Sequence, residues 1–131
     1  MQSKPSPLTV IIDPSGIQFG MPGKPLEFYV VVSNQSYQGA VIDLFVDEVS
    51  QTLHEWCRAS RKSLALGSQQ SSEVTFEFDI PVDALPETYD YTLVVDAPEH
   101  FPEDTPIHYP RQLKVKPIDQ TGVRLMTPLF L

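Results

Sequence analysis

Hydrophobic and polar residues alternate with a period of two along several short segments of the chain. The apolar positions with this spacing are Leu8, Val10 and Ile12; Leu26, Phe28, Val30 and Val32; Ile42, Leu44 and Val46; Val74, Phe76, Phe78 and Ile80; Tyr89, Tyr91, Leu93 and Val95; Leu113 and Val115. Alternation predicts strands with one buried and one solvated face, the pattern of antiparallel sheets. We therefore predict an all-β fold, an antiparallel two-sheet sandwich of about seven strands.

Prolines divide the chain around these segments. No proline lies between Leu26 and Ile80, so this stretch accommodates several fully paired strands. Prolines recur in the stretch 97–110, which separates the last two predicted strands. This stretch is too long for a hairpin turn, and loops of such length are usually functional or disordered. We predict a long Pro-rich loop before the last strand, and a short helical turn near residues 50–56.

The size and charge of the chain limit its class. The 131 residues, 41% hydrophobic and 20% charged, suit one globular domain. We divide the chain into a lead at residues 1–6, a sandwich at 7–117 and a C-terminal extension at 118–131. A formal net charge of −8 argues against nucleic acid and anionic membranes as partners, because both require a basic surface.

The cysteine content and the N-terminal sequence predict a compartment. The single cysteine, Cys57, cannot form an internal disulfide, which excludes the disulfide-scaffold class. The N-terminus lacks the apolar stretch of a signal peptide, and no apolar run approaches the ~20 residues of a membrane span. We therefore expect a cytoplasmic protein without direct membrane insertion.

A family resemblance begins at residues 23–36. There Gly-Lys-Pro precedes the segment Leu-Glu-Phe-Tyr-Val-Val-Val-Ser-Asn-Gln-Ser, so a Pro-containing turn leads into a strand that ends in Asn and a small polar residue. Trp56, a strand that ends at Pro81, and the segment 88–95 follow in order. This order resembles bacterial Ig-like β-sandwich domains of the CARDB-like and alpha-galactosidase-associated kind. The resemblance covers residues 7–117 and implies an Ig-like sandwich, while such domains serve as spacers, docking modules and sugar-enzyme appendages.

No arrangement of residues in the sequence predicts catalysis. Cys57 lies near His54 and Arg58, a neighbourhood that can activate a thiol, but a strand or a one-turn helix does not orient His54 toward it. We interpret Cys57 as a small buried residue. The histidines lack the spacing of a zinc site, and the glycines are too scattered for a phosphate-binding loop. We expect no enzymatic activity and no cofactor.

Other residues allow more than one interpretation. We favour Trp56 as a core residue between the sheets, with an exposed ligand platform as the alternative. Asn34 most simply supports a turn through hydrogen bonds to the backbone. The acidic residues of the Pro-rich loop, among them Asp96, allow three interpretations: a solvated face, a calcium site, or a docking surface for a basic partner.

Two surfaces are predicted to bind other protein subunits. The first is the loop 97–110, in which a rigid backbone would carry acidic and apolar side chains: Glu99, Phe101, Glu103, Asp104, Ile107 and Tyr109. The second is the C-terminal extension, because a contiguous apolar segment marks a contact site: Val123, Leu125, Met126, Leu129 and Phe130.

Together these features predict a non-catalytic Ig-like structural or docking module of a larger protein assembly. The sandwich without a signal sequence, the acidic loop and the apolar extension also resemble accessory components of phage-tail-like contractile injection systems. The alternative is a carbohydrate-binding or other ligand-binding sandwich that uses Trp56 and the loop aromatics.

Overall fold

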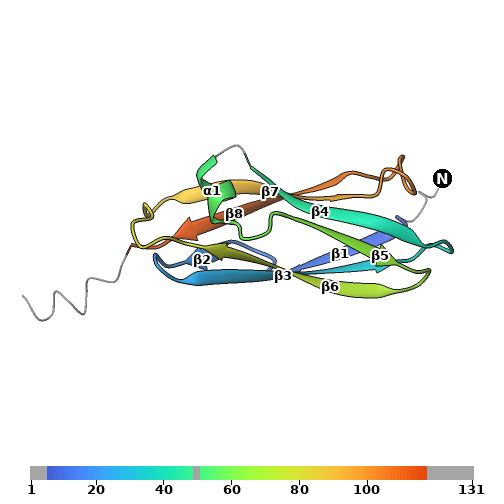
Figure 1. Cartoon of the computed structure of the whole chain (residues 1–131), viewed down its shortest axis with the longest axis horizontal. Helices are drawn as coiled ribbons and strands as arrows, with labels where there is room; N and C mark the ends of the chain where they lie inside the picture. Colours follow the sequence, from blue (N-terminus) through green and yellow to red (C-terminus); the bar gives the residue numbers. More distant parts are fainter. Residues whose placement is uncertain (1–5, 49–50, 118–131) are drawn as a thin grey trace, which may run out of the picture.

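The computed structural model describes residues 6–48 and 51–117, which form two packed β-sheets (Figure 1). The first sheet has the order β1-β3-β6, and the second has the order β2-β8-β7-β4-β5. The strands are β1 (Leu8–Asp13), β2 (Gln18–Gly20), β3 (Pro25–Asn34), β4 (Ala40–Glu48), β5 (Arg61–Leu66), β6 (Ser71–Asp79), β7 (Thr88–Asp96) and β8 (Ile107–Val115). The predicted all-β two-sheet sandwich is confirmed. No helix of the described residues is long and apolar enough to cross a membrane.

The core lies between the sheets and consists of the side chains that the alternation places on one face. In the first sheet Phe28 packs parallel to Phe76, with ring centroids 5.1 Å apart, and stacks on Phe78 at 5.8 Å. Tyr91 of the opposite sheet contacts the same cluster, 5.9 Å from Phe28. Phe28, Phe76 and Phe78 are fully buried, as the alternation predicts.

The helical turn predicted near residues 50–56 is α1 (Gln51–Trp56), which connects β4 to β5. Trp56 is 8% exposed and packs edge-on against Tyr89 at 5.0 Å, so its interpretation as a core residue is confirmed. Cys57 is also buried and forms a β-bridge with Phe78, in agreement with a small buried residue. Burial removes the Trp56 ring as an exposed platform for a sugar.

The beginning of β8 differs from the prediction. The strand starts at Ile107, not near Leu113, so the loop before it spans 97–106 instead of 97–110. The N–H of Val115 donates to the Glu87 carbonyl at 2.9 Å. The backbone N–H and C=O groups of odd-numbered residues of β8 therefore point toward β7. The missing N–H of Pro110 therefore faces the other edge, where a proline costs no pairing in the sheet.

The short strand β2 was not predicted, because three residues are too few to show a period of two. It pairs with β8 in parallel, with Gln18 opposite Leu113 and Gly20 opposite Val115. The other strand pairs are antiparallel, as expected. The chain thus leaves the first sheet after β1 and joins the second sheet at β2.

Candidate protein-binding site

The loop between β7 and β8 is anchored in the core by Phe101. This side chain is 6% exposed, and the backbone N–H of Phe101 donates to the Ala97 carbonyl at 2.7 Å. Thr105 closes the loop, because its hydroxyl donates to the Phe101 carbonyl at 2.7 Å and accepts from the Ala97 N–H at 3.1 Å. The contacts inside the loop therefore fix its backbone without any partner.

The acidic residues of this loop remain at the surface. Glu99, Glu103 and Asp104 are exposed, whereas His100 is half-buried. The Nδ1 of His100 accepts a hydrogen bond from the Val41 N–H at 3.5 Å, which links the loop to β4. The loop thus presents carboxylates on a support that is fixed at its centre and at both ends.

Asn34, the last residue of β3, organises the neighbouring β3–β4 turn. Its side chain is fully buried, and its Nδ2 donates to the carbonyls of Gln38 at 2.9 Å and of Leu66 and Gly67 at 3.2 Å. Its Oδ1 accepts from the N–H of Ser36 at 3.0 Å and from its hydroxyl at 2.8 Å. These bonds tie the turn to the β5–β6 turn, and they confirm the role predicted for Asn34.

The β7–β8 loop, the β3–β4 turn and the two residues before β1 line a groove of about 700 Å³, which we call the loop-end groove. Figure 1 places these segments at the end of the sandwich where β1 begins. The lining residues are Ser6, Pro7, Gln35, Ser36, Tyr37, Gln38, His100, Phe101, Pro102, Glu103 and Asp104. None of them is Lys or Arg, and Tyr37 is 94% exposed. The groove therefore offers an acidic surface with an exposed aromatic ring.

The predicted partner-binding residues divide into three groups. Glu103 and Asp104 line the groove and Glu99 lies exposed beside it, whereas Phe101 is committed to the domain's own core. Ile107 and Tyr109 belong to β8 and are half-buried, so they are strand residues and not loop anchors. The predicted extension residues, from Val123 to Phe130, lie outside the described residues.

Tyr37 was not predicted as a site residue. The sequence contained a signal for it, because an aromatic side chain in a turn between two strands has no face of a sheet on which to pack. What the sequence did not show is the proximity of this turn to the β7–β8 loop. That proximity arises from the way in which β4 and β7 pair, with Asp43 opposite Asp96.

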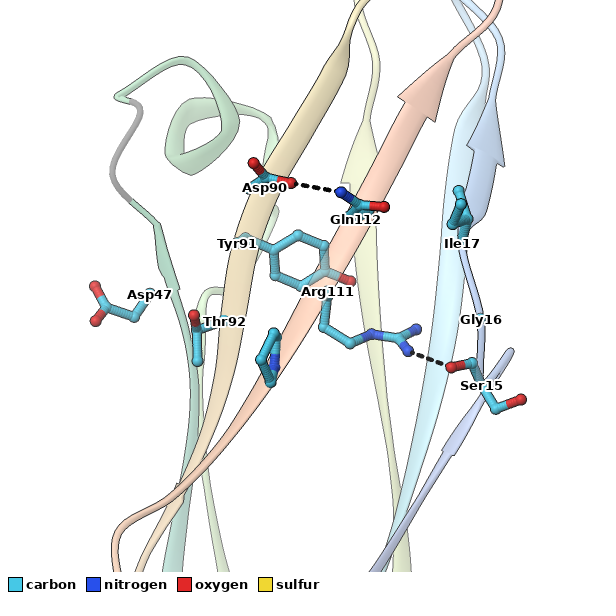
Figure 2. A pocket seen from close by; sticks show the side chains of 10 residues that line it. Ser15, Gly16, Ile17, Asp47, Asp90, Tyr91, Thr92, Arg111 and Gln112 are labelled. Carbon is cyan, nitrogen blue, oxygen red and sulfur yellow. Dashed lines mark hydrogen bonds between the residues drawn. The ribbon is translucent and has the colours of Figure 1, made fainter.

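A second groove, which we call the side groove, lies where the chain crosses from β1 to β2 beside β8 (Figure 2). It has a volume of about 530 Å³ and is lined by Ser15, Gly16, Ile17, Asp47, Asp90, Tyr91, Thr92, Pro110, Arg111 and Gln112. Arg111 is 6% exposed, and its guanidinium donates to the carbonyls of Pro14 at 2.7 Å and Ser15 at 3.2 Å. The buried guanidinium therefore holds the crossing segment against the second sheet.

Tyr91 completes this cluster. It lies opposite Arg111 across the β7–β8 pair, and its buried hydroxyl donates to the Oε1 of Gln18 in β2. Burial raises the pKa of Tyr91 from 10 to about 12, against the opposing effect of the Arg111 guanidinium. Arg111 and Gln18 were not predicted as buried residues, because polar residues in a strand suggest exposure.

The pKa of Tyr91 predicts the stability of the fold in alkaline solution. A raised pKa favours the protonated form in the folded state, so this stability is complete below pH 10 and is lost as the pH rises toward 12. Tyr91→Phe should therefore flatten the decline of the urea midpoint between these pH values, whereas Tyr37→Phe should leave the decline unchanged. Equal slopes in both variants would contradict the assignment.

The described residues contain no cluster of side chains suited to bind a metal ion. Within residues 6–48 and 51–117, no group of three or more His, Cys, Asp and Glu side chains could hold a metal ion. The calcium hypothesis for the acidic loop therefore gains no ligand set in this part of the chain. The lining of the loop-end groove contains hydroxyls and carboxylates, and its one histidine, His100, is bonded to the Val41 N–H.

Comparisons with known proteins identify the class of fold. No protein-family model matches the chain, and no curated protein matches it in sequence. Among solved structures, the CARDB domain of the PF1109 protein from Pyrococcus furiosus, in complex with di-metal ions, is similar with a TM-score of 0.59 and 16% identity; the match covers 91% of this chain and 100% of that domain. The PapD-like domain 7 of human CEP192 is similar with a TM-score of 0.53 and 19% identity, with 90% of each chain covered.

A family 123 glycoside hydrolase from Clostridium perfringens is also similar, with a TM-score of 0.66 and 12% identity. The match covers 86% of this chain but only 28% of the hydrolase. At these identities the similarity defines the fold alone. The chain is an Ig-like β-sandwich domain, with CARDB and PapD-like domains among its structural neighbours. The names of these structures give no support to the resemblance to contractile injection systems.

Proposed function

We propose that this chain is a non-catalytic docking module that binds another protein through the loop-end groove and acts in the cytoplasm. The observation that carries the proposal is the combination of exposed Tyr37, Glu103 and Asp104 on backbone that is already fixed. Aromatic side chains dominate the energetics of protein interfaces, and preorganised loops lose little entropy on binding.

The charge of the groove defines the kind of partner. Among the described residues its lining contains carboxylates and no Lys or Arg, and the whole chain carries a net charge of −8. Complementary charge favours encounter with a positively charged segment. We therefore propose a partner that inserts a basic segment between Tyr37 and the Glu103–Asp104 pair.

The C-terminal extension is proposed as a second contact. The last strand of the described residues, β8, ends at Val115, and the Lys116 N–H still donates to the Gly20 carbonyl of β2 at 2.9 Å. The apolar residues from Val123 onward then supply surface for a partner. A contractile injection system is one assembly in which such a module would serve. Identification of the partner would show whether this chain belongs to such an assembly.

Co-purification from the source cells, followed by mass spectrometry, tests the proposal. The wild-type chain should retain a specific partner, and Glu103→Lys/Asp104→Lys should lose it. The matched control is Asp83→Lys/Glu87→Lys, which makes the same change in charge at exposed positions between β6 and β7.

A chain that ends at Ile118 should keep its melting temperature and lose its partner. A drop in melting temperature of more than about 10 °C would assign the extension to the domain's own core.

The alternative of carbohydrate binding is tested on a glycan array. Retention of a glycan that Tyr37→Ala abolishes, together with co-purification that is indifferent to the charge reversals, would replace protein docking by ligand binding.

A further inference from the structure

β1 is an edge strand whose one charged residue, Asp13, lies at its end. The sheet orders place β1, β6, β2 and β5 at edges, and an unprotected edge can pair with a strand of another chain. Leu8–Ile12 contains no charged residue and no proline. Ile11, on the outer face of the sheet, is 61% exposed. This combination is one that folded proteins usually avoid at an edge.

The other edges are protected. On β6, Glu73 and Glu77 lie on the outer face, and the Arg58 N–H occupies the Glu77 carbonyl at 2.9 Å. β5 carries Arg61 and Lys62, and β2 has only three residues. Between its ends β1 thus has none of the features that protect the other edges: charged side chains, a carbonyl occupied by a hydrogen bond, or a very short strand.

The hydrogen bonds at the start of β1 show which backbone groups face outward. The Gln35 N–H donates to the Pro7 carbonyl at 2.8 Å. The backbone N–H and C=O groups of odd-numbered residues of β1 therefore point toward β3. Leu8 agrees with this assignment, because the Ser6 hydroxyl donates to its carbonyl at 2.8 Å and accepts from its N–H at 3.3 Å. The N–H and C=O groups of Val10 and Ile12 therefore face the free edge.

We propose that a second copy of this chain pairs with β1 in the antiparallel direction, about a twofold axis at Ile11. Val10 then exchanges both backbone hydrogen bonds with Ile12 of the second copy. Ile11 faces Ile11 of the second copy at a non-hydrogen-bonded position, where opposing side chains are closest. Thr9 faces Asp13 of the second copy, and the Ser6–Leu8 contact stays intact and ends the pairing.

Self-complementarity favours a second copy over a different strand. In this register an exposed isoleucine covers its own equivalent, a hydroxyl meets a carboxylate, and no like charges lie directly opposite each other. The net charge of −8 on each copy opposes association, so added salt should strengthen the pairing. The two loop-end grooves would lie at opposite ends of the continuous sheet, and neither would be covered.

Sedimentation of the full chain over a range of concentrations and salt tests the proposal. We expect a monomer–dimer equilibrium that salt shifts toward the dimer. Ile11→Lys should give a monomer with an unchanged melting temperature, because the side chain is exposed. Val41→Lys, at another exposed apolar position, should leave the dimer intact. A wild-type chain that stays monomeric, or an Ile11→Lys chain that still dimerises, would overturn the proposal.

Cross-linking tests the register. Under mild oxidation Ile11→Cys should form a disulfide-linked dimer, whereas Thr9→Cys and the wild-type chain with buried Cys57 should not. Cross-linking of Thr9→Cys without Ile11→Cys would overturn the twofold axis at Ile11. A monomer that binds an added β-strand peptide along β1 would replace the second copy by a different partner.

Discussion

Replacing Phe28 by Ala should lower the free energy of unfolding by about 3–5 kcal/mol, the range for loss of a buried aromatic ring. Phe28 is fully buried in β3, the central strand of the first sheet, and stacks on Phe76 at 5.1 Å. The Arg111 guanidinium also lies 5.7 Å from its ring centroid. The substitution therefore creates a cavity in contact with both sheets, which the rigid strands cannot fill.

Urea unfolding measures this loss, and Tyr37→Ala is the matched control. Tyr37 is an aromatic residue at 94% exposure, so its removal should leave the urea midpoint unchanged. A Phe28→Ala variant no less stable than Tyr37→Ala would contradict the packing of the two sheets described here.

Replacing Asn34 by Ala should cost about 3 kcal/mol and should also weaken docking. The substitution leaves the Leu66 carbonyl and the Ser36 N–H without their side-chain partner, and each unpaired buried group costs about 1–3 kcal/mol. The β3–β4 turn, which carries Tyr37, would lose its bonds to the β5–β6 turn. Stability and partner affinity should therefore fall together.

Ser36→Ala is the control for this prediction. It removes the hydroxyl that donates to Asn34 but keeps the Asn34 amide and its bonds to the Gln38 and Leu66 carbonyls. Its effect on the urea midpoint should be less than half that of Asn34→Ala. Equal effects would show that the hydroxyl, and not the amide, holds the turn.

The alternation of hydrophobic and polar residues predicted those strands that have one face buried in the core. β6 is the clearest case, since Val74, Phe76 and Phe78 are all buried as predicted. The start of β8 was missed because a proline such as Pro110, considered without knowledge of strand pairing, indicates a loop. Only the pairing with β7 shows that its missing N–H faces an edge.

The candidate site was predicted in part. Acidic residues and prolines identified the β7–β8 loop, but the burial of Phe101 depends on contacts across the core, which residue type does not report. Arg111 was missed for the opposite reason, because a charged side chain suggests exposure, and its burial depends on tertiary contacts such as the hydrogen bonds to the Pro14 and Ser15 carbonyls. Local patterns therefore gave the strands, and tertiary contacts decided the site.

The most direct test of docking through the loop-end groove is the affinity for the partner recovered by co-purification, measured by titration calorimetry with two charge-reversed chains. Glu103→Lys/Asp104→Lys should weaken binding by about tenfold or more, because like charge then meets the basic segment. Asp83→Lys/Glu87→Lys should bind like the wild-type chain. If both pairs of substitutions weaken binding equally, or if neither does, the loop-end groove is not the docking surface.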